Sequence, residues 1–166
     1  MLPQVDWAVN VAGIPVIIMN PNQSSPAAKT AAQKPQMMHD HANAVWTKYI
    51  LPSGFTNLLV IAHSAGGHCL ASVFKNNKKT FFTQTAKIAY TDSYPIALKD
   101  LTLAEKKQMK KKAVNYKSSN FDLGVAIKDT GKVPSSCPLV SAGHPKHAFS
   151  TGCSWPIVAE WFGDDL

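Results

Sequence analysis

The chain has 166 residues, of which 45% are hydrophobic and 16% are charged, a composition typical of a folded protein rather than a disordered one. No apolar run reaches the ~20 residues of a membrane-spanning helix, and the first six residues do not have the pattern of a signal peptide. The net charge of +7 comes entirely from lysine. Because lysine lacks the bidentate fork of arginine, we expect no sequence-specific contact with nucleic acid.

The cysteines and histidines indicate neither a disulfide framework nor a metal site. Cys69, Cys137 and Cys153 stand at unrelated spacings, which predicts free thiols in a reducing compartment. We therefore expect an intracellular protein, cytoplasmic or nuclear, without contact to a membrane. His39-Asp40-His41 has no third ligand nearby, so neither a metal nor any other cofactor is expected.

Along the chain, helical patterns alternate with apolar runs typical of buried strands. Helices are predicted over residues 2–12, 36–50, 68–74, 102–116 and 154–162. Strands are predicted over residues 14–19, 57–62, 86–91 and 138–142, and residues 23–34 are predicted to form a loop. Strands that are apolar on both faces predict an α/β fold of one domain over residues 1–166, with a mostly parallel sheet covered by helices on both faces.

One strand-to-helix junction carries the segment Ala62-His63-Ser64-Ala65-Gly66-Gly67. In α/β hydrolases a nucleophilic serine occupies such a turn, and small residues on either side of it, here Ala62 and Gly66, let the backbone pass closely. The N–H groups at Ala65, Gly66 and Gly67 would then point toward a developing oxyanion. A serine that merely caps the following helix fits the same residues, so the motif alone leaves both interpretations open.

The other members of a triad should follow later strands, in the order serine, acid, histidine. Asp92 directly follows the predicted strand 86–91, and His147 follows 138–142. Asp122 and Asp129 are alternative acids, because they lie on the loop before the last strand. Asp92 could also be an ordinary turn residue. The order predicts Ser64, Asp92 and His147 as a catalytic triad.

Other polar residues near these segments have weaker interpretations. His63, beside the serine, and His144, on the loop of His147, are expected to line the pocket. The lysine run at residues 106–112 is interpreted as a solvated helix face, with a nuclear-import or polyanion-binding patch as the alternative.

The motifs NPN, AHSAGG, TDS and VSAG…H occur in the same order in a known family. With the closing helix, they make the chain resemble the Argonaute-binding-protein-two (Arb-two) domain family over nearly its whole length. The resemblance implies an α/β-hydrolase-like fold and relatives that act in heterochromatin silencing, in cotranscriptional regulation and at the C-terminus of class II histone deacetylases. It also implies Ser64, Asp92 and His147 as the hydrolase-like positions.

Members of that family carry an earlier strand and a His-Gly-x-Gly-type loop, which supplies a second oxyanion donor. We find no such segment before Pro3, so missing N-terminal strands and an incomplete oxyanion hole are expected. Two functions follow. The first is a serine esterase or acyl hydrolase acting on a small acyl or ester substrate. The alternative is a non-catalytic binding module for Argonaute, chromatin-silencing or RNA-processing partners.

Overall fold

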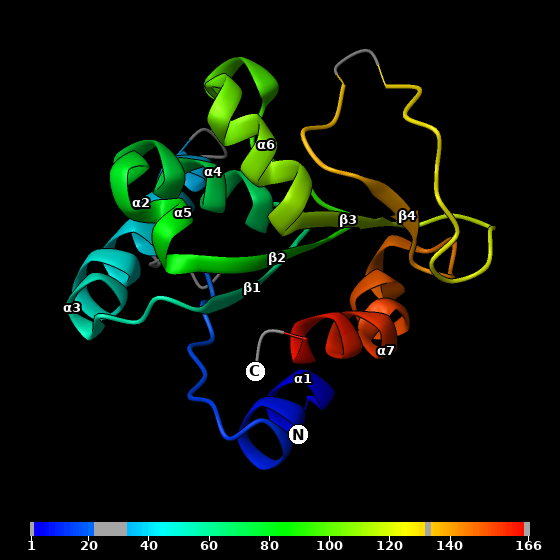
Figure 1. Cartoon of the computed structure of the whole chain (residues 1–166), viewed down its shortest axis with the longest axis horizontal. Coiled ribbons are helices and arrows are strands. Elements are labelled where there is room, and N and C mark those ends of the chain that lie inside the picture. The colour runs from blue at the N-terminus through cyan, green and yellow to red at the C-terminus, as the bar shows by residue number, and fades with distance from the viewer. Residues whose placement is uncertain (1, 22–32, 132–133, 165–166) are drawn as a thin grey trace.

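Four parallel strands form the centre of the computed structural model, which describes residues 2–21, 33–131 and 134–164. The strands are β1 (Leu58–His63), β2 (Thr85–Thr91), β3 (Ala113–Lys117) and β4 (Leu139–Ser141), and they lie side by side in chain order (Figure 1). Because every pair is parallel, all four strands present their carboxyl ends at one edge of the sheet. The predicted α/β class and parallel sheet are confirmed.

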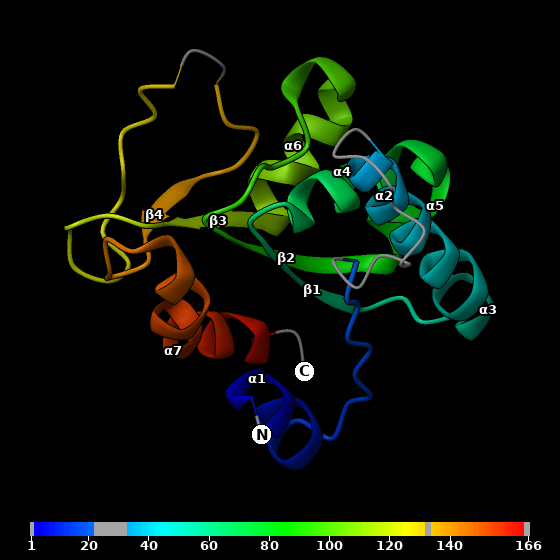
Figure 2. The ribbon, with the colours of Figure 1, turned by 180° about the vertical axis from the view of Figure 1, so that it is seen from behind.

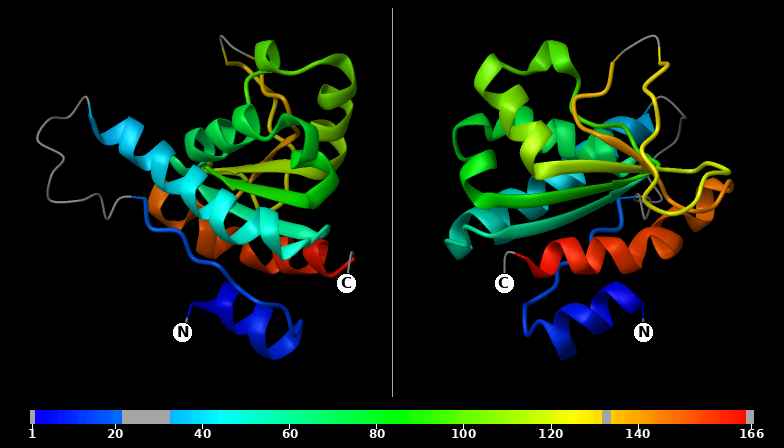
Figure 3. Two further views of the ribbon diagram at one scale, coloured as in Figure 1. Left: turned by 90° about the vertical axis from the view of Figure 1, so that its left-hand side faces the viewer. Right: turned by 45° about the vertical axis from the view of Figure 1, so that its right-hand side comes forward.

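Helices cover both faces of this sheet, as Figures 2 and 3 show. One face carries α2 (Gln33–Val45) with its π-helical extension Trp46–Ile50, α3 (Leu51–Ser53), α4 (Gly66–Asn76), α5 (Lys78–Gln84) and α6 (Leu103–Lys112). The other face carries α7 (Ser150–Gly163), with α1 (Pro3–Asp6) and its π-helical extension Trp7–Val11 packed against it. Short 3-10 turns lie at Leu98–Asp100 and His147–Phe149.

Each face has its own hydrophobic core, which is what buries the strands on both sides. Under α4 and α5, Trp46 and Phe74 pack on Phe81 with ring centroids 5.7 and 5.4 Å away. Under α7, the sheet packs on Val158 and Phe162, with other aromatic side chains at the margin. Among the described helices, none is long and apolar enough to cross a membrane.

The predicted helix 102–116 is half right. It begins as predicted, since Thr102 and Glu105 form a capping box. It ends at Lys112, however, and Ala113–Lys117 is strand β3, paired with β2 and β4. The lysine-rich run has good helical propensity, and sequence alone does not show where pairing with a neighbouring strand overrides it.

The predicted strand at residues 14–19 is wrong. These residues pair with no described strand, and Val16, Ile17 and Ile18 are 39 to 67% exposed. A β-branched apolar run predicts an extended backbone, but a strand also needs a neighbour with free N–H and C=O groups. As a result, β1 forms an edge of the described sheet.

Two helices differ from their predictions as well. Helix α5 was not predicted, and α7 begins at Ser150 instead of Ser154. Pro156 therefore lies inside α7, where it lacks only the hydrogen bond to the exposed Gly152 one turn earlier. Most of the predicted loop 23–34 lies outside the described residues, whereas the helices predicted at 2–12 and 36–50 are confirmed.

Candidate active site

The predicted serine lies directly after β1, in a strained backbone conformation. Ser64 has φ 51°, in the left-handed region that residues with a Cβ atom rarely adopt. Its N–H donates to the carbonyl of Thr91 at 3.3 Å, and α4 begins two residues later at Gly66. A sharp, strained turn from strand to helix is the geometry expected of a nucleophile elbow.

A buried serine after β2 fixes this turn. The Ser93 hydroxyl donates to the carbonyl of Ser64 at 2.5 Å and accepts from the N–H of Gly67 at 3.1 Å. The Asn115 side chain holds Ser93 in turn, because it accepts from the N–H of Ser93 and donates to the carbonyl of Ser93. Sequence reasoning missed Ser93 and Asn115, because their roles depend on which strands are neighbours.

Two backbone donors at the turn remain free. Within the described residues, the N–H groups of Ala65 and Gly66 have no acceptor, whereas that of Gly67 is bound by Ser93. An ideal Cβ built on Gly66 would lie 3.8 Å from the Cβ of Ala62, so the small side chain of Ala62 lets α4 start close to β1. Both N–H groups are therefore available to a ligand, and the role of Ala65 and Gly66 as oxyanion donors stays a prediction.

The candidate acid lies against the candidate histidine. The Asp92 carboxylate Oδ2 is 2.7 Å from His147 Nδ1. Asp92 is 8% exposed and, like Ser64, has a left-handed backbone, with φ 47°. Of the alternative acids, Asp129 instead accepts from the N–H groups of Gly131 and Ser135.

Asp92 also has two partners that were not predicted. Lys117 Nζ lies 2.5 Å from Oδ1, and the Ser118 hydroxyl donates to Oδ2 at 2.5 Å. Burial raises the pKa of Asp92, but hydrogen bonds from Lys117, Ser118 and His147 outweigh it and lower that pKa to about 2. Lys117 is the last residue of β3. Because most of that strand was predicted as helix, the sequence did not indicate that Lys117 lies at the carboxyl edge of the sheet.

The two predicted pocket-lining histidines have different surroundings. The ring of His63 stacks on that of His147, with centroids 4.7 Å apart and planes 29° apart. His63 Nδ1 lies 2.9 Å from the carbonyl of Thr91 and so carries the hydrogen. His144 instead packs edge-on against Phe149.

The hydroxyl of Ser64 is not hydrogen-bonded to His147 in the way that the carboxylate of Asp92 is. In the described part of the chain, no hydrogen bond joins Ser64 to His147, whose ring bonds Asp92 and stacks on His63. Because the hydrogen bonds of catalytic serines often tighten only when a substrate binds, the triad stays a prediction.

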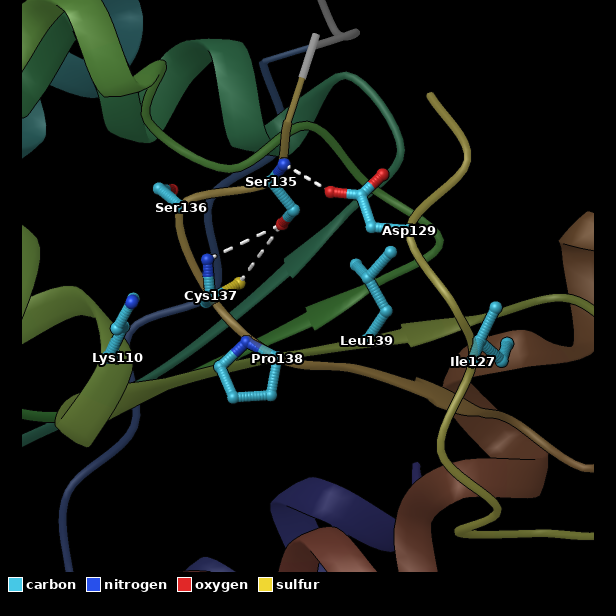
Figure 4. Close-up of a pocket in the computed structure, with 8 residues that line it drawn as sticks. All are labelled: Lys110, Ile127, Asp129, Ser135, Ser136, Cys137, Pro138 and Leu139. Carbon is cyan, nitrogen blue, oxygen red and sulfur yellow. Dashed lines mark hydrogen bonds between the residues drawn. The ribbon is translucent and has the colours of Figure 1, made fainter. Parts of the chain in front are cut away.

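The two hollows detected in the described surface lie elsewhere. One has a volume of about 350 Å³ and is bordered by Lys110, Ile127, Asp129 and residues 135–139 (Figure 4). The other, of about 310 Å³, lies near Thr56 and Lys111. Neither is lined by Ser64, Asp92 or His147. The described histidines, cysteines and carboxylates form no group of three that could hold a metal ion.

Fold and site together define an α/β protein with a strained serine and an Asp–His pair after the strands of a parallel sheet. Sequence comparison adds relatives of modest identity. The chain is 28% identical over 128 residues to a cotranscriptional regulator ARB2A homolog of Xenopus tropicalis, covering 76% of this chain and 30% of that protein. It is 25% identical over 126 residues to the mouse cotranscriptional regulator ARB2A, covering 75% of this chain and 30% of that protein.

A further relative is a FAM172 family protein homolog of Caenorhabditis elegans, 34% identical over 93 residues, which cover 55% of this chain and 28% of that protein. These matches support a relation to the ARB2A and FAM172 proteins, although the chain spans less than a third of their length. The ARB2A proteins are named as cotranscriptional regulators, and none of these names describes a hydrolase or a histone deacetylase. No protein-family model matches the sequence, and no solved structure gives a significant match.

Proposed function

We propose that the chain is an α/β binding module of a regulatory protein that works with transcription, and that it acts by holding a protein or chromatin partner. The observation that carries the proposal is the similarity to proteins named cotranscriptional regulators. Such a role is consistent with a location in the nucleus or cytoplasm. We further propose that the described residues belong to one domain.

The carboxyl edge of the sheet offers a surface on which a partner can dock. Exposed aromatic side chains, Tyr94, Phe121 and Phe149, follow three of the four strands. Exposed aromatic residues of this kind are common in protein interfaces. The partner is proposed to dock on this edge of the sheet.

The resemblance drawn from the sequence makes an Argonaute protein the first partner to test. The purified chain is immobilised, and binding of a purified Argonaute protein is measured at equilibrium. We expect a micromolar or tighter dissociation constant, unchanged within about twofold by Ser64→Ala, because binding needs no nucleophile.

The docking edge is tested in the same experiment. The double substitution Phe121→Ala and Phe149→Ala should weaken binding at least about tenfold, since truncating aromatic anchors commonly costs ~2 kcal/mol or more. Leu103→Ala, which truncates an exposed apolar side chain on α6, is the matched control and should leave binding unchanged. Absence of binding by the wild-type chain would count against an Argonaute partner.

A second candidate function is hydrolysis of an acyl ester, and the 2.7 Å contact between Asp92 and His147 favours it. Ser64 Oγ would attack the carbonyl carbon, and its proton would pass to His147 and then to the leaving alcohol. Water would then cleave the acyl-serine bond and restore the hydroxyl. This candidate requires ester turnover that Ser64→Ala abolishes.

A further inference from the structure

The acid of the candidate triad contacts both a lysine and the candidate histidine. Lys117 Nζ lies 2.5 Å from Asp92 Oδ1, and His147 Nδ1 lies 2.7 Å from Oδ2. Lys117 is the last residue of β3, whose neighbours in the sheet are β4 and β2, and Asp92 directly follows β2. The contact is therefore set by the sheet itself rather than by a loose surface loop.

The charge of a triad carboxylate has a defined task. As the histidine takes the proton of the serine, it becomes an imidazolium, and the carboxylate beside it stabilises that positive charge. A lysine on the same carboxylate offsets its negative charge and repels the imidazolium. The base then takes a proton less readily, and the serine is a weaker nucleophile.

We propose that Lys117 is a positioning residue that restrains the reactivity of Ser64 by compensating the charge of Asp92. The inference rests on the second candidate function, in that it requires Ser64, Asp92 and His147 to be able to act together. It gives a reason why a chain with hydrolase-like geometry is related to proteins named as regulators.

The other groups around the pair do not supply this effect. Ser118 donates a neutral hydroxyl to Asp92 Oδ2, and His63 stacks on His147 with its Nδ1 hydrogen directed at the carbonyl of Thr91. Lys146 precedes His147 in the chain but has an exposed side chain and no described contact with Asp92. Among the described residues, Lys117 is therefore the lysine paired with Asp92, on the carboxylate that also contacts the candidate base His147.

The test is the rate at which an alkyl fluorophosphonate labels Ser64 between pH 6 and pH 9, read by mass spectrometry. In labelling, a bond forms between Ser64 Oγ and phosphorus, the phosphorus–fluorine bond breaks, and the serine proton passes to His147. We compare wild type, Lys117→Met, Lys117→Gln, Lys117→Arg and Ser64→Ala. Lys79→Met, on the exposed face of α5, is the control for loss of one charge.

We expect Lys117→Met and Lys117→Gln to raise the rate on the alkaline plateau about two- to threefold. The acidic limb of the profile should move up by roughly half a pH unit, because the imidazolium gains stability. Lys117→Arg and Lys79→Met should behave as wild type. A merely structural lysine would give the opposite sign, since its loss would loosen Asp92 and slow labelling.

The outcomes separate the two ideas. If Ser64 is labelled, but Lys117→Met and Lys117→Gln label no faster than wild type, the role of Lys117 alone is overturned. Circular dichroism must show that these variants are folded. Labelling in no variant would overturn it together with the triad on which it rests. Faster labelling in both neutral variants, but not in Lys117→Arg, is the result that the proposal requires.

Discussion

Ser64 and Asp92 are the non-glycine residues with a positive φ among those described, and both belong to the candidate site. Each such conformation costs about 1–3 kcal/mol and persists only where the surroundings hold it. Here Ser93 bonds the carbonyl of Ser64, and the N–H of Asp92 donates to the carbonyl of Tyr116 at 2.8 Å. Local strain and the candidate functional residues therefore coincide.

The closest approach at the turn involves Gly67. A Cβ at this position would lie 2.3 Å from the carbonyl oxygen of Tyr94 and 2.5 Å from the Ser93 hydroxyl. We expect Gly67→Ala to lower the free energy of unfolding by about 1–3 kcal/mol, measured by urea denaturation, because the backbone must shift. Gly152→Ala on α7 meets no atom within 4 Å and should be neutral or stabilising. Equal effects of both substitutions would contradict the close approach.

Asp92 predicts a pH dependence of stability. The pKa of its native carboxyl is about 2, below the ordinary 3.8, so the folded chain binds this proton less tightly than the unfolded chain. Its stabilising contribution is therefore complete above about pH 4 and is lost as the pH falls toward 2. Urea denaturation of wild type and Asp92→Asn should show a larger difference at pH 5 than at pH 2.5. A difference independent of pH would refute the ion-pair account.

Sequence could predict the three candidate residues because each follows a strand or its loop, where a polar side chain after an apolar run marks the carboxyl edge. The Asp92–His147 contact expected between them is present, while their catalytic roles stay a prediction. Lys117 and Ser93 could not be predicted in the same way. Their contacts depend on the order of the strands, and one of those strands was predicted as part of a helix.

At the scale of elements, the two edges of the sheet differ. Residues 125–127 cover the edge at β4. The N–H of Ile127 donates to the carbonyl of Leu139, and the N–H of Ser141 donates to the carbonyl of Val125. The free side of β1 has no described partner strand. Proteins usually protect such an edge with charges, proline or a bulge toward solvent, but Leu58–Ala62 has neither charge nor proline.

We therefore expect the chain to associate through the β1 edge, with sedimentation velocity showing a concentration-dependent mass. Ile61→Lys should reduce this association by adding a charge to the partly exposed edge. Val125→Lys, on the covered edge, adds the same charge and should have little effect. A wild-type chain that stays monomeric at every concentration would contradict the expectation.

The segment at residues 14–19 shows what an apolar run leaves undetermined. Its composition predicts a strand, but the segment has no regular secondary structure, and Ile17 and Ile18 are exposed. Pairing is a property of two segments, so a single run cannot establish it. The same limit explains β3, where Val114 and Tyr116 favour a strand once β2 lies beside them.

At the scale of the whole molecule, the charge of +7 is not concentrated at the candidate site. Lys107, Lys110 and Lys111 are exposed on α6, whereas Lys112 bonds the carbonyls of Phe82 and Thr85. Part of the lysine run therefore stabilises the fold, and the rest forms a solvated helix face.

We propose that the chain acts by binding and keeps its serine at low reactivity. The most direct test is the hydrolysis rate of short acyl esters by the wild-type chain and by Ser64→Ala. The account predicts equal rates for the two proteins, at the level of the buffer background. Turnover well above background that disappears in both Ser64→Ala and His147→Ala would contradict it and establish a serine esterase.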